Sequence, residues 1–299
     1  MIVVVSLCLV SVNADSIYTW GDRKIPETEL KNISAIAAGS SHSLVLKNDG
    51  TIAAWGGNDD GQSEAPDGNG FAAISTKYFH SLALKSDGSI VAWGENSYDQ
   101  VSNVPSGNDY VAVSPGSDHS LALKSDGSIV AWGINNGAYY DYGQGTAPDG
   151  NDFVAISAGA YHNIALKNNG SIIAWGSDDN GVGAITVPDG NDFTAISAGI
   201  YYNLALKSDG SIIGWGSNHR GQTLVPAGND YVAIAAGMFH GLALKSDGSI
   251  VAWGWDKYGQ VSDTPSGNGY IAIAAGYGHN LALKSDGSIV AWGADYKVR

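Results

Sequence analysis

Apolar and polar residues alternate along this chain in short runs that are joined by glycine-containing turns. Residues 80–94, HSLALKSDGSIVAWG, show the pattern most clearly. With a period of two, Leu82 and Leu84 lie on one face of a strand and small residues on the other. Asp87-Gly88 then predicts a two-residue type I′ hairpin turn, and the β-forming residues after it predict a returning strand. A hairpin with two apolar faces needs another sheet against each face, so the pattern predicts packed sheets.

The same hairpin recurs along the chain. Its first strand begins at His42, His80, His119, His162, Tyr202, His240 and His279. Its second strand ends in a Trp-Gly pair, and these pairs begin at Trp20, Trp55, Trp93, Trp132, Trp175, Trp215, Trp253 and Trp292, with spacings of 35 to 43 residues. A nearly fixed period built from strands indicates a propeller or a solenoid.

A third strand, rich in Ala and Gly, precedes each hairpin, as in residues 153–159. Small side chains suit the innermost strand of a propeller, where the strands converge on the axis. The sequence therefore predicts an all-β fold, a seven-bladed β-propeller with mainly three-stranded antiparallel blades. The repeats span 33–56, 71–94, 110–133, 153–176, 193–216, 231–254 and 270–293. Residues 16–21 form an additional Trp-Gly strand, which either docks on the last blade or marks a fragment of a longer array.

Strand direction sorts the loops between two faces of the predicted disc. The Gly-x-x-His loops and the loops after Trp-Gly share one side, which we call the top face. The Asp-Gly turns and the proline-containing linkers share the opposite side, the bottom face. Bottom segments are nearly identical between repeats, whereas top segments differ in almost every repeat. A constant scaffold with diversified loops is typical of a recognition surface.

The top loops are rich in aromatic residues and Met, mixed with Asp. This composition is typical of protein-binding hot spots, and it also suits stacking on carbohydrate. The candidate partner-binding residues are Tyr78, Phe79, Tyr98, Asp118, Tyr139, Tyr140, Tyr142, Tyr161, Tyr201, His219, Arg220, Met238, Phe239, Trp255, Tyr258 and Tyr277. In the alternative interpretation these side chains only cover the blade edges and the mouth of the channel.

The side chains that begin the middle strands resemble a ring of metal ligands, but we expect them to be structural. They are His42, His80, His119, His162, Tyr202, His240 and His279. Because they are in phase with the leucines, they face the neighbouring blade, where buried imidazoles are normally hydrogen-bonded. The acidic loops 58–61 and 178–181 lack the ligand spacing of known calcium motifs. We therefore expect neither a metal nor a cofactor.

The charge and composition of the chain limit the classes of partner that it could bind and the compartments in which it could function. The chain of 299 residues has a net charge of −14 and few arginines, which argues against nucleic acid. Cys8 is the only cysteine, so disulfides do not support the fold. Residues 2–12 are apolar but too short to span a bilayer, and no later segment could cross one. Residues 1–14 are predicted to be a signal peptide, or alternatively a buried strand or a ragged gene start. We expect a single propeller domain over 15–299, monomeric and secreted to a periplasmic or extracellular location.

The repeated pattern A-G-x-x-H-S-L-A-L-K-x-D-G-x-I-x-x-W-G-x-N-x-x-G-Q resembles the regulator of chromosome condensation repeat. The closing glutamine is matched by Gln62, Gln100, Gln144, Gln222 and Gln260. The resemblance covers residues 16–293 and implies a seven-bladed propeller. The short period is most similar to that of a secreted relative, β-lactamase inhibitory protein II, which implies three strands per blade. The sequence departs from the pattern at Thr76-Lys77, Pro115, Val182 and Tyr202.

The motif content favours a binding protein over an enzyme. The chain has no G-x-S-x-G elbow, no H-E-x-x-H and no phosphate loop. We expect a secreted, non-catalytic propeller that binds an extracellular protein through its top face. The resemblance implies inhibition of a serine hydrolase such as a β-lactamase as the most specific version. The alternatives are a carbohydrate-binding or polysaccharide-degrading propeller that uses His219-Arg220, and an intracellular exchange-factor-like regulator.

Overall fold

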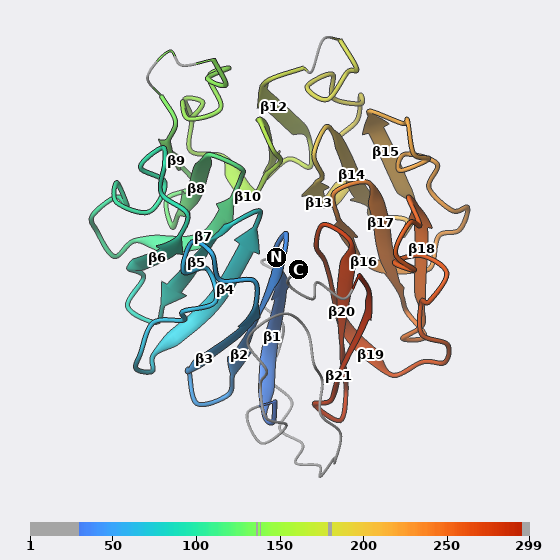
Figure 1. The fold of residues 1–299 in the computed structure, drawn as a ribbon. Coiled ribbons are helices and arrows are strands. Elements are labelled where there is room, and N and C mark those ends of the chain that lie inside the picture. Colours follow the sequence, from blue (N-terminus) through green and yellow to red (C-terminus); the bar gives the residue numbers. More distant parts are fainter. Residues whose placement is uncertain (1–29, 136, 138, 179–180, 295–299) are drawn as a thin grey trace.

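The computed structural model describes residues 30–135, 137, 139–178 and 181–294. Within these residues the chain forms only strands, turns and loops, and the strands make seven three-stranded antiparallel sheets. The sheets are arranged in a ring (Figure 1), which confirms the predicted seven-bladed propeller. No described segment is a helix with the length and hydropathy needed to cross a bilayer. The predicted signal peptide and the predicted strand at 16–21 lie outside the described residues.

Each blade contains an inner, a middle and an outer strand in chain order. The inner strands are β1 (Ile33–Ala38), β4 (Phe71–Lys77), β7 (Tyr110–Pro115), β10 (Phe153–Ala158), β13 (Phe193–Ala198), β16 (Tyr231–Ala236) and β19 (Tyr270–Ala275). The middle strands are β2 (His42–Lys47), β5 (His80–Lys85), β8 (His119–Lys124), β11 (His162–Lys167), β14 (Tyr202–Lys207), β17 (His240–Lys245) and β20 (His279–Lys284). The outer strands are β3 (Ile52–Gly56), β6 (Ile90–Gly94), β9 (Ile129–Gly133), β12 (Ile172–Gly176), β15 (Ile212–Gly216), β18 (Ile250–Gly254) and β21 (Ile289–Gly293). Blades 1 to 7 are numbered in this order.

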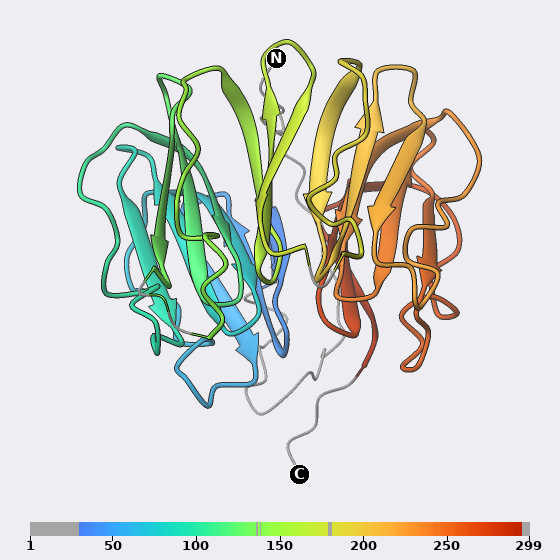
Figure 2. The same ribbon diagram turned by 90° about the horizontal axis from the view of Figure 1, so that it is seen from above.

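The ring is closed by direct packing of blade 7 on blade 1. Each inner strand contacts the inner strands of both neighbours, and β19 contacts β1 in the same way. Leu281 and Leu283 of blade 7 share a core cluster with Val45 and Trp55 of blade 1. The view turned by 90° shows the sheets standing side by side, with loops at both ends of the strands (Figure 2). Both loop faces therefore belong to one continuous disc.

The leucines of each middle strand form the interface with the next blade. Leu82 and Leu84 of β5 pack against Tyr110, Ala122 and Trp132 of blade 3. The small face of the same strand receives the leucines of the preceding blade, because Ala83 packs against Leu44 and Leu46. Large residues thus meet small ones at the junction, which allows the two sheets to pack closely. Burying one such leucine stabilises the fold by about 1.5–3 kcal/mol.

The Asp-Gly turns differ from the predicted two-residue type I′ turns. Gly88 N donates to Lys85 O at 2.9 Å, and Lys85 N donates to Ser89 O at 2.8 Å, which encloses a three-residue loop. Only Gly88 has a positive φ, of 84°, whereas Asp87 has an ordinary φ. The geometry is that of a type I turn followed by a left-handed glycine. Asp87 Oδ1 accepts hydrogen bonds from Ser89 N at 2.9 Å and from the Ser89 hydroxyl at 2.6 Å, and these bonds hold the turn.

The bottom face is built from the same contacts in most blades. Lys167 Nζ lies 5.3 Å from the centre of the Phe153 ring and 3.1 Å from Asp152 Oδ2. Equivalent cation–π contacts join Lys85 to Phe71, Lys124 to Tyr110, Lys207 to Phe193, Lys245 to Tyr231 and Lys284 to Tyr270. The repeated lysines are therefore held by the aromatic residue that begins the inner strand of their own blade.

Candidate functional site

The two diversified loops of each blade lie together on the top face. The end of the outer strand pairs with the start of the middle strand, as Gly176 pairs with His162. One further hydrogen bond joins the loops, from Ser177 N to Tyr161 O at 2.7 Å in blade 4. Blade 6 has the same bond, from Trp255 N to Phe239 O at 2.9 Å. The predicted common face of these loops is therefore present in the structure.

A belt of buried imidazoles lies below the top loops and joins the blades. His Nε2 contacts a polar side chain of the next blade in six pairs: His42–Ser81, His80–Ser120, His119–Asn163, His162–Asn203, His240–Asn280 and His279–Ser43, at 2.6 to 3.0 Å. Burial lowers the pKa of each imidazole, to about 3 for His42 and His80 and to about 4 for the other four. The rings are neutral at physiological pH and make hydrogen bonds between blades, not a ligand set around a common ion.

Tyr202 makes the equivalent link in blade 5 with different chemistry. Its buried hydroxyl donates to the carbonyl oxygens of Gly237, at 3.2 Å, and His240. The next blade has Gly241 where the others have Ser or Asn, so it offers no side chain to a histidine. The longer phenol reaches the backbone of blade 6 instead.

Polar side chains fix the backbone of the loops that follow the outer strands. The buried glutamine that closes five of the motifs accepts from the amide two residues earlier, as Gln260 Oε1 does from Tyr258 N at 2.8 Å. Asp256 Oδ1 accepts from Val261 N at 2.8 Å and from Ser262 N at 3.0 Å. In the acidic loop 178–181, Asp178 Oδ1 accepts from Ile185 N at 3.2 Å. These carboxylates organise loops, and the loops hold their aromatic side chains in fixed positions.

Five tyrosines form the first aromatic cluster, cluster A, over blades 3, 4 and 5. Tyr161 is central: Tyr140 stacks on it with 5.7 Å between ring centroids, Tyr142 meets it edge-on at 6.0 Å, and Tyr201 lies at 5.9 Å. Tyr139 contacts Tyr140 at 5.0 Å and is 85% exposed. Cluster A offers solvent a broad surface of rings and hydroxyl groups.

Four residues form the second aromatic cluster, cluster B, over blades 6 and 7. Trp255 is central, with Phe239 at 5.7 Å, Tyr258 at 5.3 Å and Tyr277 at 6.0 Å between centroids. All three pairs are edge-to-face, a favourable arrangement for aromatic rings. Lys257 Nζ lies 5.1 Å from the centre of the Tyr258 ring.

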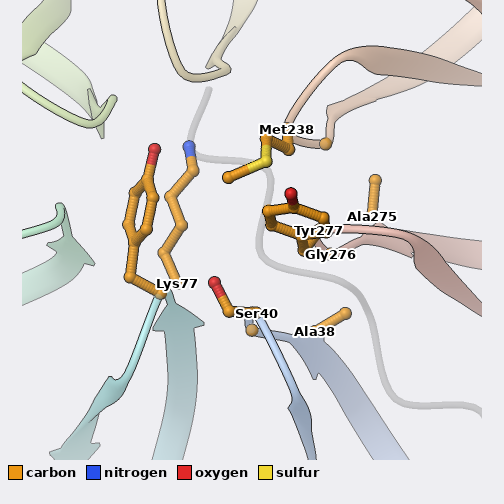
Figure 3. Close-up of a pocket in the computed structure, with 10 residues that line it drawn as sticks. Ala38, Ser40, Lys77, Met238, Ala275, Gly276 and Tyr277 are labelled. Carbon is orange, nitrogen blue, oxygen red and sulfur yellow. The ribbon is translucent and has the colours of Figure 1, made fainter. Parts of the chain in front are cut away.

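A small pocket opens between inner strands at the mouth of the channel. Its walls come from blades 1, 2, 6 and 7 and include Ser40, Met238 and Tyr277. The side chains of Lys77 and Met238 extend toward one another across it, and the Tyr277 ring lies beside Met238 (Figure 3). The pocket therefore joins cluster B to the centre of the top face.

Lys77 crosses the mouth of the channel. Its Nζ donates to Ala158 O at 2.8 Å and to Ala198 O, at the ends of the inner strands of blades 4 and 5. Burial lowers the pKa of Lys77 to about 7. Thr76-Lys77 replaces the Ala-Gly of the repeat pattern. Nothing local in the sequence shows that this side chain spans the channel.

Two candidate residues lie between the channel and cluster A. The Tyr78 hydroxyl is buried without a hydrogen-bond partner among the described residues, and burial raises the Tyr78 pKa above its usual value. Asp118 is partly buried, and burial raises its pKa to about 6. In the described residues the Tyr78 hydroxyl thus has no hydrogen-bond partner, and the Asp118 carboxylate has no ion pair.

The remaining candidates do not join the clusters. Phe79 is 45% exposed on blade 2, and Tyr98 is partly buried, with its amide bound to Gln100 Oε1 at 2.9 Å. His219 and Arg220 are exposed on the outer loop of blade 5. Arg220 takes part in that loop only through its backbone amide, which donates to Gln222 Oε1 at 2.8 Å among the bonds of the described residues.

The comparisons with known proteins agree with the repeated architecture. The family model of the Regulator of chromosome condensation (RCC1) repeat matches residues 33–62, 71–100, 110–144, 153–182, 193–222, 231–260 and 270–297. No curated protein matches the chain.

Solved structures share the propeller fold at low sequence identity. The ectodomain of the Physcomitrella patens receptor kinase CR4 aligns with a TM-score of 0.73 and 22% identity, covering 87% of this chain and 74% of that one. The CRINKLY WD40 ectodomain of the Arabidopsis thaliana receptor kinase ACR4 gives 0.72 and 22%, covering 88% and 98%. Prp20p of Saccharomyces cerevisiae gives 0.70 and 19%, covering 88% and 85%. Because the family model matches seven segments that together span most of the chain, the protein belongs to the regulator of chromosome condensation repeat family.

Proposed function

We propose that this propeller is a binding protein whose top face holds a protein partner. The observation that supports it most is the contrast between the two faces. The top face has two aromatic clusters on loops that differ between blades, and a pocket lies beside cluster B. The bottom face repeats one lysine–aromatic contact from blade to blade. Exposed aromatic groups on a rigid support are the usual anchors of protein interfaces.

Similar propellers supply precedents for protein binding. Prp20p of Saccharomyces cerevisiae is described with its binding to Gsp1p and histones, and it has also been crystallised bound to Kap60. Those partners are properties of Prp20p. For the present chain they support only the general proposal of a protein partner.

The proposal is tested by removing rings from the top face. Tyr161→Ala, Tyr201→Ala, Phe239→Ala and Trp255→Ala, alone and combined, should each weaken partner binding, and hot-spot rings typically account for about 2 kcal/mol or more. Partners are captured from secreted material, identified by mass spectrometry, and their affinities measured with purified components. The matched controls are Val154→Ser and Val232→Ser, which change exposed apolar residues at the bottom ends of inner strands. Equal binding by the top-face variants and wild type would contradict the proposal.

We also propose a more specific version, in which the chain is secreted and inhibits a serine hydrolase such as a β-lactamase. The apolar stretch at residues 2–12 and the resemblance of the repeats support it. Export is tested by sequencing the N-terminus of secreted protein, which should begin at Asp15. Inhibition is tested in a hydrolysis assay with a panel of β-lactamases. A glycan array run in parallel reports whether carbohydrate is bound instead.

A further inference from the structure

Three tyrosine rings of cluster A form a row beside a carboxylate. Tyr161 lies in the middle, with Tyr140 stacked at an interplanar angle of 15° on one side and Tyr201 tilted by 30° on the other. Asp118 comes from the neighbouring top loop of blade 3. That loop is joined to the Tyr161 loop by a backbone hydrogen bond of 3.3 Å from Ser117 N. The carboxylate and the row of rings are thus held on adjacent, connected loops.

The hydroxyl of Ser117 interacts with both groups. It donates to Asp118 Oδ1 at 3.2 Å, and its interaction with the Tyr161 side chain lowers the pKa of that phenol, opposing the effect of burial. None of the ion pairs among the described residues includes Asp118. Burial raises the pKa of this carboxyl, and the nearby Glu95 adds to the effect, while the bond from Ser117 opposes it. A cation placed beside Asp118 would stabilise its charged form.

Other aromatic groups at the surface are already covered by a lysine of the chain. Lys257 lies over Tyr258 in cluster B, and the bottom-face lysines lie over the rings that begin the inner strands. The described cation–π contacts include none with the rings of cluster A. Lys77 comes close on the channel side, but its ammonium group is bound to the carbonyls of Ala158 and Ala198. Tyr140 and Tyr161 therefore lie near a carboxylate, and no described cation–π contact covers either ring.

We propose that Asp118, Tyr140 and Tyr161 bind a lysine or arginine side chain of the protein partner. This inference rests on the proposed function and names the chemistry of one contact within it. The Tyr140 ring attracts a cation through its quadrupole, the Tyr161 ring stacked against it supports that ring, and the carboxylate supplies the opposite charge. The net charge of −14 attracts a basic surface to the same face at long range.

The site is tested first without the partner. The ring signals of isotope-labelled tyrosines are followed by NMR during titration with N-acetyl-arginine amide, N-acetyl-lysine amide and the uncharged isostere N-acetyl-citrulline amide. The two cationic probes should shift the Tyr140 and Tyr161 signals saturably, and the comparison between them shows which cation is preferred. Asp118→Asn should weaken the binding of the cationic probes by roughly 2- to 30-fold.

Two further variants separate loss of the site from loss of structure. Tyr140→Leu removes one exposed ring but keeps the carboxylate, and it should also weaken the binding of the cationic probes. Asp59→Asn removes an exposed charge from the top face of blade 1 and should leave probe binding unchanged. Equal shifts with the citrulline probe, or unchanged affinity in Asp118→Asn with an unchanged melting temperature, would overturn the proposal.

The partner itself provides the second arm. Asp118→Asn should slow association and reduce its dependence on salt, because a charge that steers the encounter is removed. If partner binding is lost in the ring variants of clusters A and B but is normal in Asp118→Asn and Tyr140→Leu, the protein-binding function stands and the cation contact is wrong. If partner binding survives in every top-face variant, the proposed function itself is wrong.

Discussion

A lysine occupies the position at which six of the seven blades have glycine. In those blades the glycine packs against the ring of the following histidine or tyrosine; a Cβ on Gly116 would lie 2.2 Å from His119 Cε1. Blade 2 avoids this contact because β4 continues through Lys77, which pairs with His80. The extension requires Tyr78 to adopt a φ of 47°, which is unusual for a residue with a side chain. The extension of β4 thus places both Lys77 and Tyr78 at the mouth of the channel.

The buried ammonium of Lys77 predicts an alkaline rise in stability. Its pKa is about 7 in the folded chain, against an ordinary value of 10.5 for lysine, so between these values the unfolded chain binds one more proton. The free energy of unfolding should therefore rise with pH across this window, and the cost of the buried charge should be fully present below pH 7. Lys77→Met should remove this component, as measured by urea unfolding at pH 6 to 10.5.

The matched control for that experiment is Lys85→Met on the bottom face, where Lys85 lies 6.0 Å from the Phe71 ring centre. This variant should keep the alkaline component of wild type. An unchanged pH profile in Lys77→Met would show that the ammonium is not desolvated at the mouth of the channel.

Tyr202 and Gly241 form a second exception that involves two adjacent blades. A Cβ on Gly241 would lie 2.4 Å from the Trp253 ring, and Tyr202 reaches the backbone beyond it. Tyr202→His should destabilise the fold by about 1–3 kcal/mol, because it removes the hydroxyl that donates to the buried carbonyl of Gly237. Gly241→Asn alone should also destabilise, through the contact with Trp253.

The double variant Tyr202→His/Gly241→Asn recreates the His–Asn pair of other blades. It should be less destabilised than the sum of the single changes, which a double-mutant cycle of unfolding free energies measures. Strict additivity would show that the two positions do not compensate one another.

At the scale of elements, the strands were predictable but the turns were not. The period of two and the repeated motifs identify all three strands of a blade because each is apolar on faces that must be buried. Asp-Gly is compatible with both a two-residue and a three-residue hairpin loop. The structure adopts the longer loop, in which the carboxylate of Asp87 binds Ser89 and the glycine alone is left-handed. The loop length depends on which residues form the last hydrogen-bonded pair between the two strands. The Asp-Gly dipeptide alone does not determine that pair.

The turn geometry predicts a clear order of mutational effects. Asp126→Ala loses two hydrogen bonds to Ser128 at an exposed site and should lower the stability only slightly. Gly127→Ala should cost more, because its φ is 87° and a Cβ would lie 2.2 Å from Asn151 O. Chemical unfolding of both variants checks the order. A larger loss in Asp126→Ala would contradict the three-residue turn.

The candidate site was predictable as a face but not as clusters. Strand direction alone places the diversified loops on one side, and their composition identifies Tyr140, Tyr161 and Trp255. Which rings meet depends on loop paths between blades, such as the reach of Tyr140 from blade 3 onto Tyr161 of blade 4. The role of Ser117 was missed for the same reason, because its backbone amide joins the top loop of blade 3 to that of blade 4 through Ala160 O.

At the scale of the whole molecule, the belt of neutral imidazoles predicts sensitivity to acid. The six histidines have pKa values of about 3 to 4 when folded, below the ordinary histidine value of 6.5. The unfolded chain therefore takes up protons first, so the stability present above pH 6.5 should be lost progressively as the pH falls toward 4. Asp118 opposes this trend by one proton, because its pKa is raised to about 6. Urea unfolding between pH 8 and 4 measures the slope.

A variant of one histidine tests the source of that slope. His162→Gln should reduce the pH dependence of the unfolding free energy by the contribution of one proton. Leu166→Ala, in the same strand, should lower stability by about 2–5 kcal/mol at every pH without changing the slope. A slope unaltered in His162→Gln would assign the acid sensitivity to other groups.

The contact between His279 and Ser43 makes the seam of the ring chemically equivalent to the junctions inside the chain. A linear array of repeats frays from its terminal units, since each of those has only one neighbour. In this ring every described blade is flanked on both sides, so no unit is predisposed to melt first. On heating, the propeller should therefore unfold in a single cooperative transition. Cleavage of any one linker by a protease should leave the propeller assembled.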